Sequence, residues 1–146
     1  MAGMSDPTQD TPVIRRCRPE EAEAVLALWR ESGATVSSTD TVEDLRRALD
    51  SPACVLVAES GGRLVGSVIG SFDGWRANLY RLVVRPECRR RGIARALVEE
   101  VTRCLARQGA RRVGALVEKD QPLAMGFWAG VGYGLDARMV RFVRNL

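Results

Sequence analysis

The segment of the sequence most able to do chemistry runs from Leu82 to Ala94 and reads Leu-Val-Val-Arg-Pro-Glu-Cys-Arg-Arg-Arg-Gly-Ile-Ala. Its apolar start is typical of a buried strand, its middle is a short basic loop, and a long helix is predicted from Gly92. The first turn of a helix has unpaired N–H groups and a partial positive charge, which attract phosphate. Gly92 lets the backbone approach a ligand closely, and the arginines at 89–91 offer forked donors that match phosphate oxygens. The segment therefore suggests a phosphate site, although an Arg-Arg-Arg-Gly turn taken alone is more often simply solvated.

Two other phosphate-binding motifs are excluded by the same residues. A Walker loop needs Gly-Lys-Ser/Thr, and the one lysine of the chain, Lys119, lies in another segment. Residues 132–137 match Gly-x-Gly-x-x-Ala, but they follow a predicted helix, whereas a dinucleotide fingerprint follows a strand. We interpret that match as accidental.

The amino-acid composition excludes several catalytic mechanisms. The chain has 146 residues and no histidine, which removes Ser-His, Cys-His and His-metal mechanisms. The four cysteines show no Cys-x-x-Cys spacing, and we expect them to be small buried apolar residues instead of disulfides or metal ligands. Cys88 lies next to three arginines that would favour a thiolate, yet no histidine is available to activate it. The net charge of +4 is too small to indicate an anionic partner.

Hydrophobic periodicity predicts a mixed α/β (α+β) domain over residues 12–146, behind a flexible tail at 1–11. The central sheet is expected to be mixed and mostly antiparallel, with about four helices beside it. The predicted strands cover residues 13–18, 54–59, 63–72, 78–84, 113–117 and 139–143, and the predicted helices cover 19–33, 41–52, 92–109 and 122–131. The start of the chain lacks the features of a signal peptide, and no apolar run is long enough to span a bilayer, so we expect a cytoplasmic protein.

These segments together resemble the GNAT superfamily of N-acetyltransferases. Arg89-Arg90-Arg91-Gly92-Ile93-Ala94 fits its Arg/Gln-x-x-Gly-x-Gly/Ala loop, and Leu82 to Pro86 fits the strand before that loop. Residues 127–133, Phe-Trp-Ala-Gly-Val-Gly-Tyr, resemble its later Phe-Tyr-x-x-x-Gly-Phe/Tyr segment. Asp73-Gly74-Trp75-Arg76 is similar to a motif of one bacterial branch of that superfamily.

The resemblance implies that acetyl-CoA is the co-substrate and that no metal takes part. The pyrophosphate would lie on Arg89 to Ala94, and the pantetheine arm would run along Leu82, Val83 and Val84. A backbone N–H of that strand would stabilise the tetrahedral oxyanion, a contribution of roughly 3 kcal/mol. The acceptor would be a primary amine, of a small molecule, a protein N-terminus or a lysine, that attacks directly in a ternary complex. Neither nucleic acid nor membrane is expected as a partner, and a homodimer is compatible with the sequence.

Three positions depart from the pattern of that superfamily. Trp128 stands where a tyrosine often protonates the departing thiolate, and Leu116 stands where some members have a glutamate base. Gln121 replaces the usual asparagine, and it and Trp128 are expected to line the cofactor site. Tyr133 and Tyr80 are the candidate catalytic acids, although Tyr133 is more simply a core aromatic residue. Glu118, Glu59 and Asp73 are the other titratable candidates.

Two other function classes remain open at this level. A non-catalytic acyl-CoA-binding domain is suggested by Trp128 and Leu116. A nucleic-acid-binding module is suggested by the arginines, but the aromatic residues are too few and too often within helices to form the stacking platform that such a module uses.

Overall fold

The computed structural model describes residues 11–119 and 122–146. The chain divides into two compact units, Met1–Ala115 and Leu116–Leu146. In the first unit the elements follow in the order β1 (Val13–Arg16), η1 (Pro19–Glu21), α1 (Ala22–Glu31), α2 (Val42–Asp50), β2 (Cys54–Ser60), β3 (Arg63–Phe72), β4 (Ala77–Val84), η2 (Pro86–Cys88), α3 (Ile93–Arg107) and β5 (Val113–Ala115). The second unit holds α4 (Pro122–Gly130).

The five strands form one sheet in the order β1-β2-β3-β4-β5. The pairs from β1 to β4 are antiparallel, and β5 runs parallel to β4. This confirms the predicted mixed, mostly antiparallel sheet. The β2–β3 connection is the predicted tight hairpin, because Gly61 and Gly62 have φ values of 58° and 74°, the left-handed pair that a two-residue type I′ turn requires.

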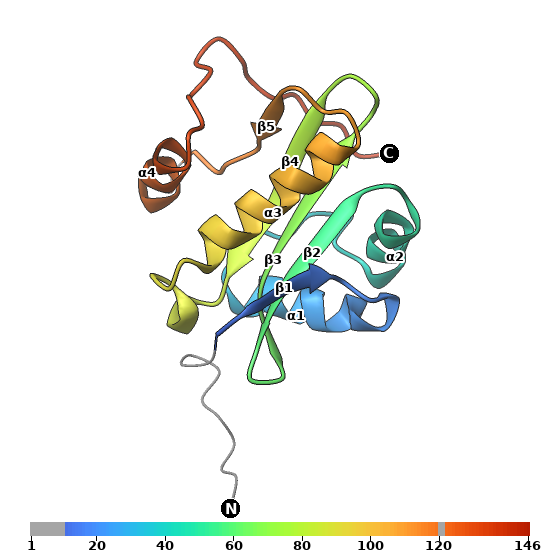
Figure 1. The fold of residues 1–146 in the computed structure, drawn as a ribbon. Coiled ribbons are helices and arrows are strands. Elements are labelled where there is room, and N and C mark those ends of the chain that lie inside the picture. The colour runs from blue at the N-terminus through green and yellow to red at the C-terminus, as the bar shows by residue number, and fades with distance from the viewer. Residues whose placement is uncertain (1–10, 120–121) are drawn as a thin grey trace, which may run out of the picture. The chain divides into compact units, whose positions relative to one another are not determined.

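Helices cover both faces of the sheet (Figure 1). Helix α3 packs on one face, where Gly66 and Gly70 of β3 leave room for it: a Cβ at Gly70 would lie 2.6 Å from Val101. Helices α1 and α2 pack on the other face, and their core with the sheet includes Val25, Leu28, Trp29, Leu45, Val55 and Val57. The apolar periodicity predicted both helices, and the alternation of β2 and β3 supplies one apolar row to each face.

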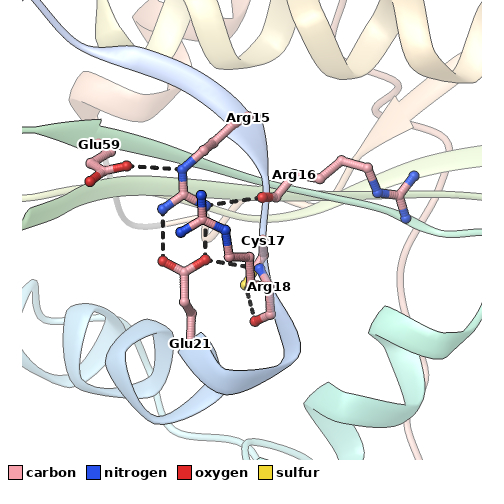
Figure 2. Close-up of polar contacts among 6 residues, drawn as sticks. All are labelled: Arg15, Arg16, Cys17, Arg18, Glu21 and Glu59. Carbon is pink, nitrogen blue, oxygen red and sulfur yellow. Dashed lines mark hydrogen bonds and ion pairs between the residues drawn. The ribbon is translucent and has the colours of Figure 1, made fainter.

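Arg15 fixes the edge strand β1 to the rest of the unit (Figure 2). Its Nε donates to Glu59 of β2 at 2.9 Å, and its two terminal nitrogens donate to the carboxylate of Glu21 at 2.8 and 2.7 Å. Glu21 also accepts from the backbone N–H of Arg18 at 2.9 Å. These bonds, the one from Arg15 above all, lower the pKa of Glu21 to about 2, and they join the strand to the start of α1.

A disulfide between Cys54 of β2 and Cys104 of α3 corrects the expectation that all four cysteines are unpaired. The sequence conceals this pair because 50 residues separate its members. Packing of α3 across β2 brings their Cα atoms to 6.5 Å, a distance within the range that a disulfide spans. Cys17 and Cys88 are free and buried, as predicted.

In the second unit, the predicted strand at 139–143 is absent: these residues lie outside any regular element. Their apolar side chains are exposed, including Val140 at 78% and Phe142 at 93%. An alternating apolar pattern favours a strand only where a neighbouring strand pairs with it, and no strand lies among residues 122–146. Across the described residues of both units, no helix is long and apolar enough to cross a membrane.

Candidate active site

The site is built around an irregularity in β4. Ser67 of β3 pairs with Val83, but Ile69, two residues further along, pairs with Tyr80, so β4 has one extra residue there. Arg81 lies in this bulge with φ of 53°, a left-handed conformation that costs a non-glycine residue about 1 kcal/mol or more. Bulges of this kind turn a strand and redirect its backbone groups.

The bulge also changes which side chains share a face. The sequence predicts by alternation that Tyr80 lies on the same face as Leu82 and Val84. In the structure Tyr80 is opposite Ile69, which packs against the α1–α2 core, whereas Val84 is opposite Gly66, which faces α3. Tyr80 and Val84 are therefore on opposite faces, and that part of the prediction is wrong. The extra residue at the bulge reverses the alternation.

A chain of polar contacts holds the bulge in place. The indole N–H of Trp29 in α1 donates to Ser67 Oγ at 2.8 Å, and Ser67 Oγ donates to the carbonyl of Arg81 at 2.9 Å. The Arg81 guanidinium lies 5.0 Å from the centroid of the Trp29 ring. It donates to the carbonyl of Thr35 at 2.9 Å and forms an ion pair with Asp40. One side chain thus connects the bulge to α1 and to the segment between α1 and α2.

Beyond the bulge, β4 has a free edge within the first unit. The parallel ladder to β5 joins Ala77, Asn78 and Leu79 to residues 113–115 and ends there. Strand β4 continues to Val84, so residues 80–84 have no β5 residue beside them. An edge of this kind can pair with an extended ligand through backbone groups.

Arg85 anchors the turn that follows β4. It is 7% exposed, its backbone N–H donates to the carbonyl of Val65 at 2.9 Å, and its Nε donates to the carbonyl of Leu64 at 2.9 Å. Its Nη1 lies 2.5 Å from the carboxylate of Glu31, which lowers the pKa of Glu31. The adjacent Cys88 is fully buried, so it is not placed to act as a nucleophile.

The loop between η2 and α3 has the geometry of an anion site. Arg90 and Gly92 both have positive φ, 63° and 78°, and Gly92 is the N-cap of α3. The first bond of the helical ladder runs from Ala96 N to Gly92 O at 3.0 Å, so the N–H groups of Ile93 and Ala94 precede the ladder and point out of the helix end. The side chains of Arg89 and Arg90 are exposed beside it, whereas Arg91 is half-buried.

The structure thus brings together two predicted parts of the site, residues 82–84 and residues 89–94. The predicted residues Trp128 and Tyr133 lie in the second unit, where their rings meet edge to face at 4.9 Å. Trp128 is 9% exposed, and Leu116 is 44% exposed. Gln121 lies outside the described residues.

Three residues of the site were missed by sequence reasoning: Trp29, Ser67 and Arg81. Trp29 and Ser67 fall in regular apolar patterns, and no motif sets them apart. The one available signal was an arginine at position 81 inside the otherwise apolar strand 79–84, since a charge within a buried strand needs a partner.

Comparison with known proteins agrees with this geometry. The model of the family described as "Acetyltransferase (GNAT) family" matches residues 20–133. The chain is a member of the GNAT acetyltransferase family. Among curated proteins, this GNAT chain is 36% identical over 121 residues to an acetyltransferase of Pectobacterium atrosepticum, a match that covers 82% of this chain and 86% of the relative.

Solved structures of low sequence identity share the fold. The PaiA N-acetyltransferase of Thermoplasma acidophilum, in complex with coenzyme A, superposes with a TM-score of 0.78 at 19% identity, over 86% of this chain and 91% of that one. The complex of AAC(6')-Iy with the bisubstrate analogue CoA-S-monomethyl-acetylneamine gives a TM-score of 0.78 at 16% identity, over 93% of this chain and 99% of that one. The GNAT fold predicted from the sequence is confirmed, and the chain is an N-acetyltransferase by family.

Proposed function

We propose that this GNAT N-acetyltransferase binds acetyl-CoA across Leu82–Ala94 and transfers the acetyl group to a primary amine. One observation carries the proposal. The β5 ladder ends at Leu79, while β4 continues past a bulge to Val84 and leads directly into the α3 N-terminus. A free strand edge, a basic loop and a helix start follow one another without interruption, in the order that an extended pantetheine arm and a pyrophosphate require.

The phosphate half of the site is supported by local electrostatics. The N–H groups of Ile93 and Ala94 and the positive end of the 15-residue helix α3 favour an anion at Gly92. The exposed Arg89 and Arg90 add charge-assisted donors. Two structural neighbours of the same fold hold coenzyme A or a CoA conjugate, which supports coenzyme A as the ligand here.

The thioester half depends on the bulge. The pantetheine arm pairs with Leu82, Val83 and Val84 as an added strand would, and a redirected N–H next to Arg81 receives the thioester oxygen. As the amine attacks, the carbonyl carbon becomes tetrahedral and its oxygen takes negative charge, which that N–H stabilises. Collapse of the intermediate breaks the carbon–sulfur bond, and the coenzyme A thiolate leaves. The amine loses a proton, and the products are an amide and free coenzyme A.

Proton transfer is assigned to Tyr80 or Tyr133. Trp128 and Leu116 cannot take up or release a proton at neutral pH, although related positions in the family do so. A thiolate leaves without protonation more readily than an alkoxide does, and a general acid typically raises the rate 10²–10⁴-fold. An active site without a strong general acid can therefore still turn over. An α-amine, with a pKa near 8, is partly neutral at pH 7.5, whereas a lysine amine at about 10.4 is almost wholly protonated. We therefore propose an acceptor amine of low pKa.

The test has two stages. Thermal melting with and without acetyl-CoA measures binding, and saturation at about 100 times Kd adds about 2.7 kcal/mol to the free energy of unfolding. A panel of α-amines and lysine-type amines is then screened for release of free coenzyme A. An unchanged melting temperature at millimolar acetyl-CoA would contradict the proposal. Binding without thiol release from any amine would favour the non-catalytic acyl-CoA-binding alternative.

A further inference from the structure

An open cavity of about 480 Å³ lies at the turn between β3 and β4. The residues that line it include Phe72, Trp75, Arg76, Asn78, Arg111 and Arg112. All of them belong to the first unit, and they come from two segments, the β3–β4 turn and the connection from α3 to β5. The volume falls within the range of small-molecule sites.

This cavity is distinct from the proposed acetyl-CoA site. The basic loop precedes α3, whereas Gly109 and the two lining arginines follow it. The 15 residues of α3 span roughly 22 Å, which separates the two places by about the length of the helix. In Figure 1 the β3–β4 turn lies at the end of α3 nearest β5, away from the loop that leads into the helix.

The β3–β4 turn is ordered by its own contacts. Asp73 Oδ1 accepts from the backbone N–H groups of Trp75 and Arg76 at 2.8 and 2.7 Å, and Asp73 N donates to the carbonyl of Arg76 at 3.1 Å. These bonds lower the pKa of Asp73, so it stays a carboxylate and the turn stays closed. A ligand that binds here does not have to order the turn first.

The cavity combines an aromatic surface with a net positive charge: three arginines line it, and the carboxylate of Asp73, which interacts electrostatically with Arg76, lies in the same turn. Trp75 is 76% exposed, and the Arg76 guanidinium lies 4.3 Å from the centroid of its ring. Arg111 and Arg112 are also exposed. No ion pair joins any of these three arginines to a carboxylate among residues 11–119 and 122–146. Trp and Arg are the residue types most enriched among those that dominate binding energy at protein interfaces.

We propose that this cavity is a second ligand site, which binds a nucleoside phosphate. Guanidinium groups match phosphate oxygens in a forked geometry, so Arg111 and Arg112 bind the phosphate. The exposed indole of Trp75 stacks on the planar base, and Arg76 on the same ring adds positive charge next to it. The nucleoside phosphate is either a free mononucleotide or the phosphoadenosine part of a second coenzyme A molecule, since both present a planar base and a phosphate.

The experiment measures the binding of AMP to the full chain by calorimetry. Because AMP can also occupy the acetyl-CoA loop, the same titration is made with Gly92→Asp, which blocks that loop, and with the exposed pair Arg89→Gln/Arg90→Gln. We expect AMP to bind with a Kd below ~1 mM in all three proteins. Arg111→Gln/Arg112→Gln should weaken AMP at least tenfold, and Trp75→Ala should weaken it about fivefold or more.

Control titrations distinguish a specific site from a general effect of lost positive charge. They also distinguish a free nucleotide from coenzyme A as the ligand. Arg46→Gln/Arg47→Gln removes two positive charges from a pair of consecutive exposed arginines on α2. This variant should bind AMP with a Kd within about twofold of that of the parent. If the Gly92→Asp variant still binds coenzyme A, and adding Arg111→Gln/Arg112→Gln abolishes that binding, coenzyme A is a ligand of the cavity. If the Gly92→Asp variant binds AMP but not coenzyme A, the ligand is a free nucleotide. The proposal is overturned if AMP binding is lost in Gly92→Asp but kept in the Arg111/Arg112 variant. It is also overturned if an acidic peptide binds there more tightly than AMP.

Discussion

The guanidinium of Arg81 lies over the indole ring of Trp29, 5.0 Å from its centroid, so a residue of the β4 bulge is held by helix α1. Ser67 completes the connection by accepting from Trp29 and donating to the carbonyl of Arg81. The left-handed backbone at Arg81 is a strained conformation that persists because its surroundings hold it. This relationship links a core aromatic residue to the backbone proposed to stabilise the oxyanion.

Arg81→Ala removes the ion pair to Asp40 and the contact over Trp29 while it leaves the strand residues 82–84 unchanged. We expect the bulge to relax and kcat to fall at least about tenfold, because small displacements of a catalytic donor are costly. The melting shift caused by acetyl-CoA should be nearly unchanged, since the phosphate loop is intact. Steady-state kinetics on one amine, with melting in parallel, measure both effects.

Arg15→Ala is the matched control for this change. Arg15 is as well shielded as Arg81, with side-chain exposures of 18% and 19%, and it also bridges separate elements. It lies at the β1 edge, so its loss should lower stability and leave kcat within about twofold. If both variants lower kcat equally, general loosening of the fold explains the effect and Arg81 has no specific positioning role.

The phosphate loop is tested by Gly92→Asp and Arg90→Ala. Gly92 has φ of 78°, and a side-chain carboxylate there would stand where phosphate must approach. We expect Gly92→Asp to abolish the melting shift by acetyl-CoA. Arg90→Ala should weaken binding and reduce its salt dependence, because an exposed guanidinium is screened by salt. Coenzyme A binding measured at low and high salt decides this; an unchanged affinity in both variants would place the cofactor elsewhere.

The sequence predicted the strands and α-helices of the first unit because each carries a strong local pattern. Residues 82–94 are informative for the same reason: strand, loop and helix start are consecutive, so their meeting needs no knowledge of the rest of the fold. The bulge at Arg81 is different, since the register against Ser67 and Ile69 sets it and no local pattern marks it. The disulfide Cys54–Cys104 also depends on packing between distant elements, which spacing in sequence does not reveal.

The predicted strand at 139–143 shows the opposite error. Alternation there is clear, yet strand formation needs a partner for the backbone groups. Tyr80 shows a related error. Alternation along the strand predicted which face of the sheet its side chain lies on, and the extra residue at the bulge places it on the opposite face. Local pattern therefore predicts which elements form, whereas register and pairing are properties of the assembled sheet.

Reduction of the Cys54–Cys104 disulfide should lower thermal stability. The bond closes a loop of 50 residues, for which chain entropy gives roughly 4 kcal/mol, or about 8–16 °C in melting temperature. Melting with and without a phosphine reductant measures this. Cys54→Ala/Cys104→Ala should lose the response to the reductant, whereas Cys17→Ala should keep it, because Cys17 is free and burial raises its pKa to about 11. A parent protein that melts identically in both conditions would contradict the contribution of the bond.

Acid should weaken the contact between Arg15 and Glu21. The pKa of Glu21 is lowered from 4.5 to about 2 by the hydrogen bond from Arg15. A lowered carboxyl pKa contributes stability that is complete above the unfolded value and is lost as the pH falls through the folded value. Glu21→Gln should therefore destabilise the protein at pH 6–7, and its difference in melting temperature from the parent should shrink between about pH 4.5 and 2. Melting across that range measures it; a difference that does not change with pH would show that charge is not involved.

The last prediction concerns how the leaving thiolate obtains a proton. In the second unit the Trp128 ring meets Tyr133 at 4.9 Å and Phe127 at 5.3 Å, and Tyr133 N donates to the carbonyl of Trp128 at 3.0 Å. If Trp128 faces the thioester sulfur in the complex, Trp128→Tyr supplies a phenol there and should raise kcat. Tyr80→Phe and Tyr133→Phe test the two candidate acids. Replacing the tyrosine that acts as the acid should lower kcat about 10²-fold, whereas replacing a tyrosine that only packs should change kcat little. Tyr133→Phe keeps the ring contact, so a fall in kcat without a fall in melting temperature reports the hydroxyl alone. If all three variants stay within about twofold of the parent on one amine, no side chain delivers the limiting proton, and the assignment of a catalytic tyrosine is wrong.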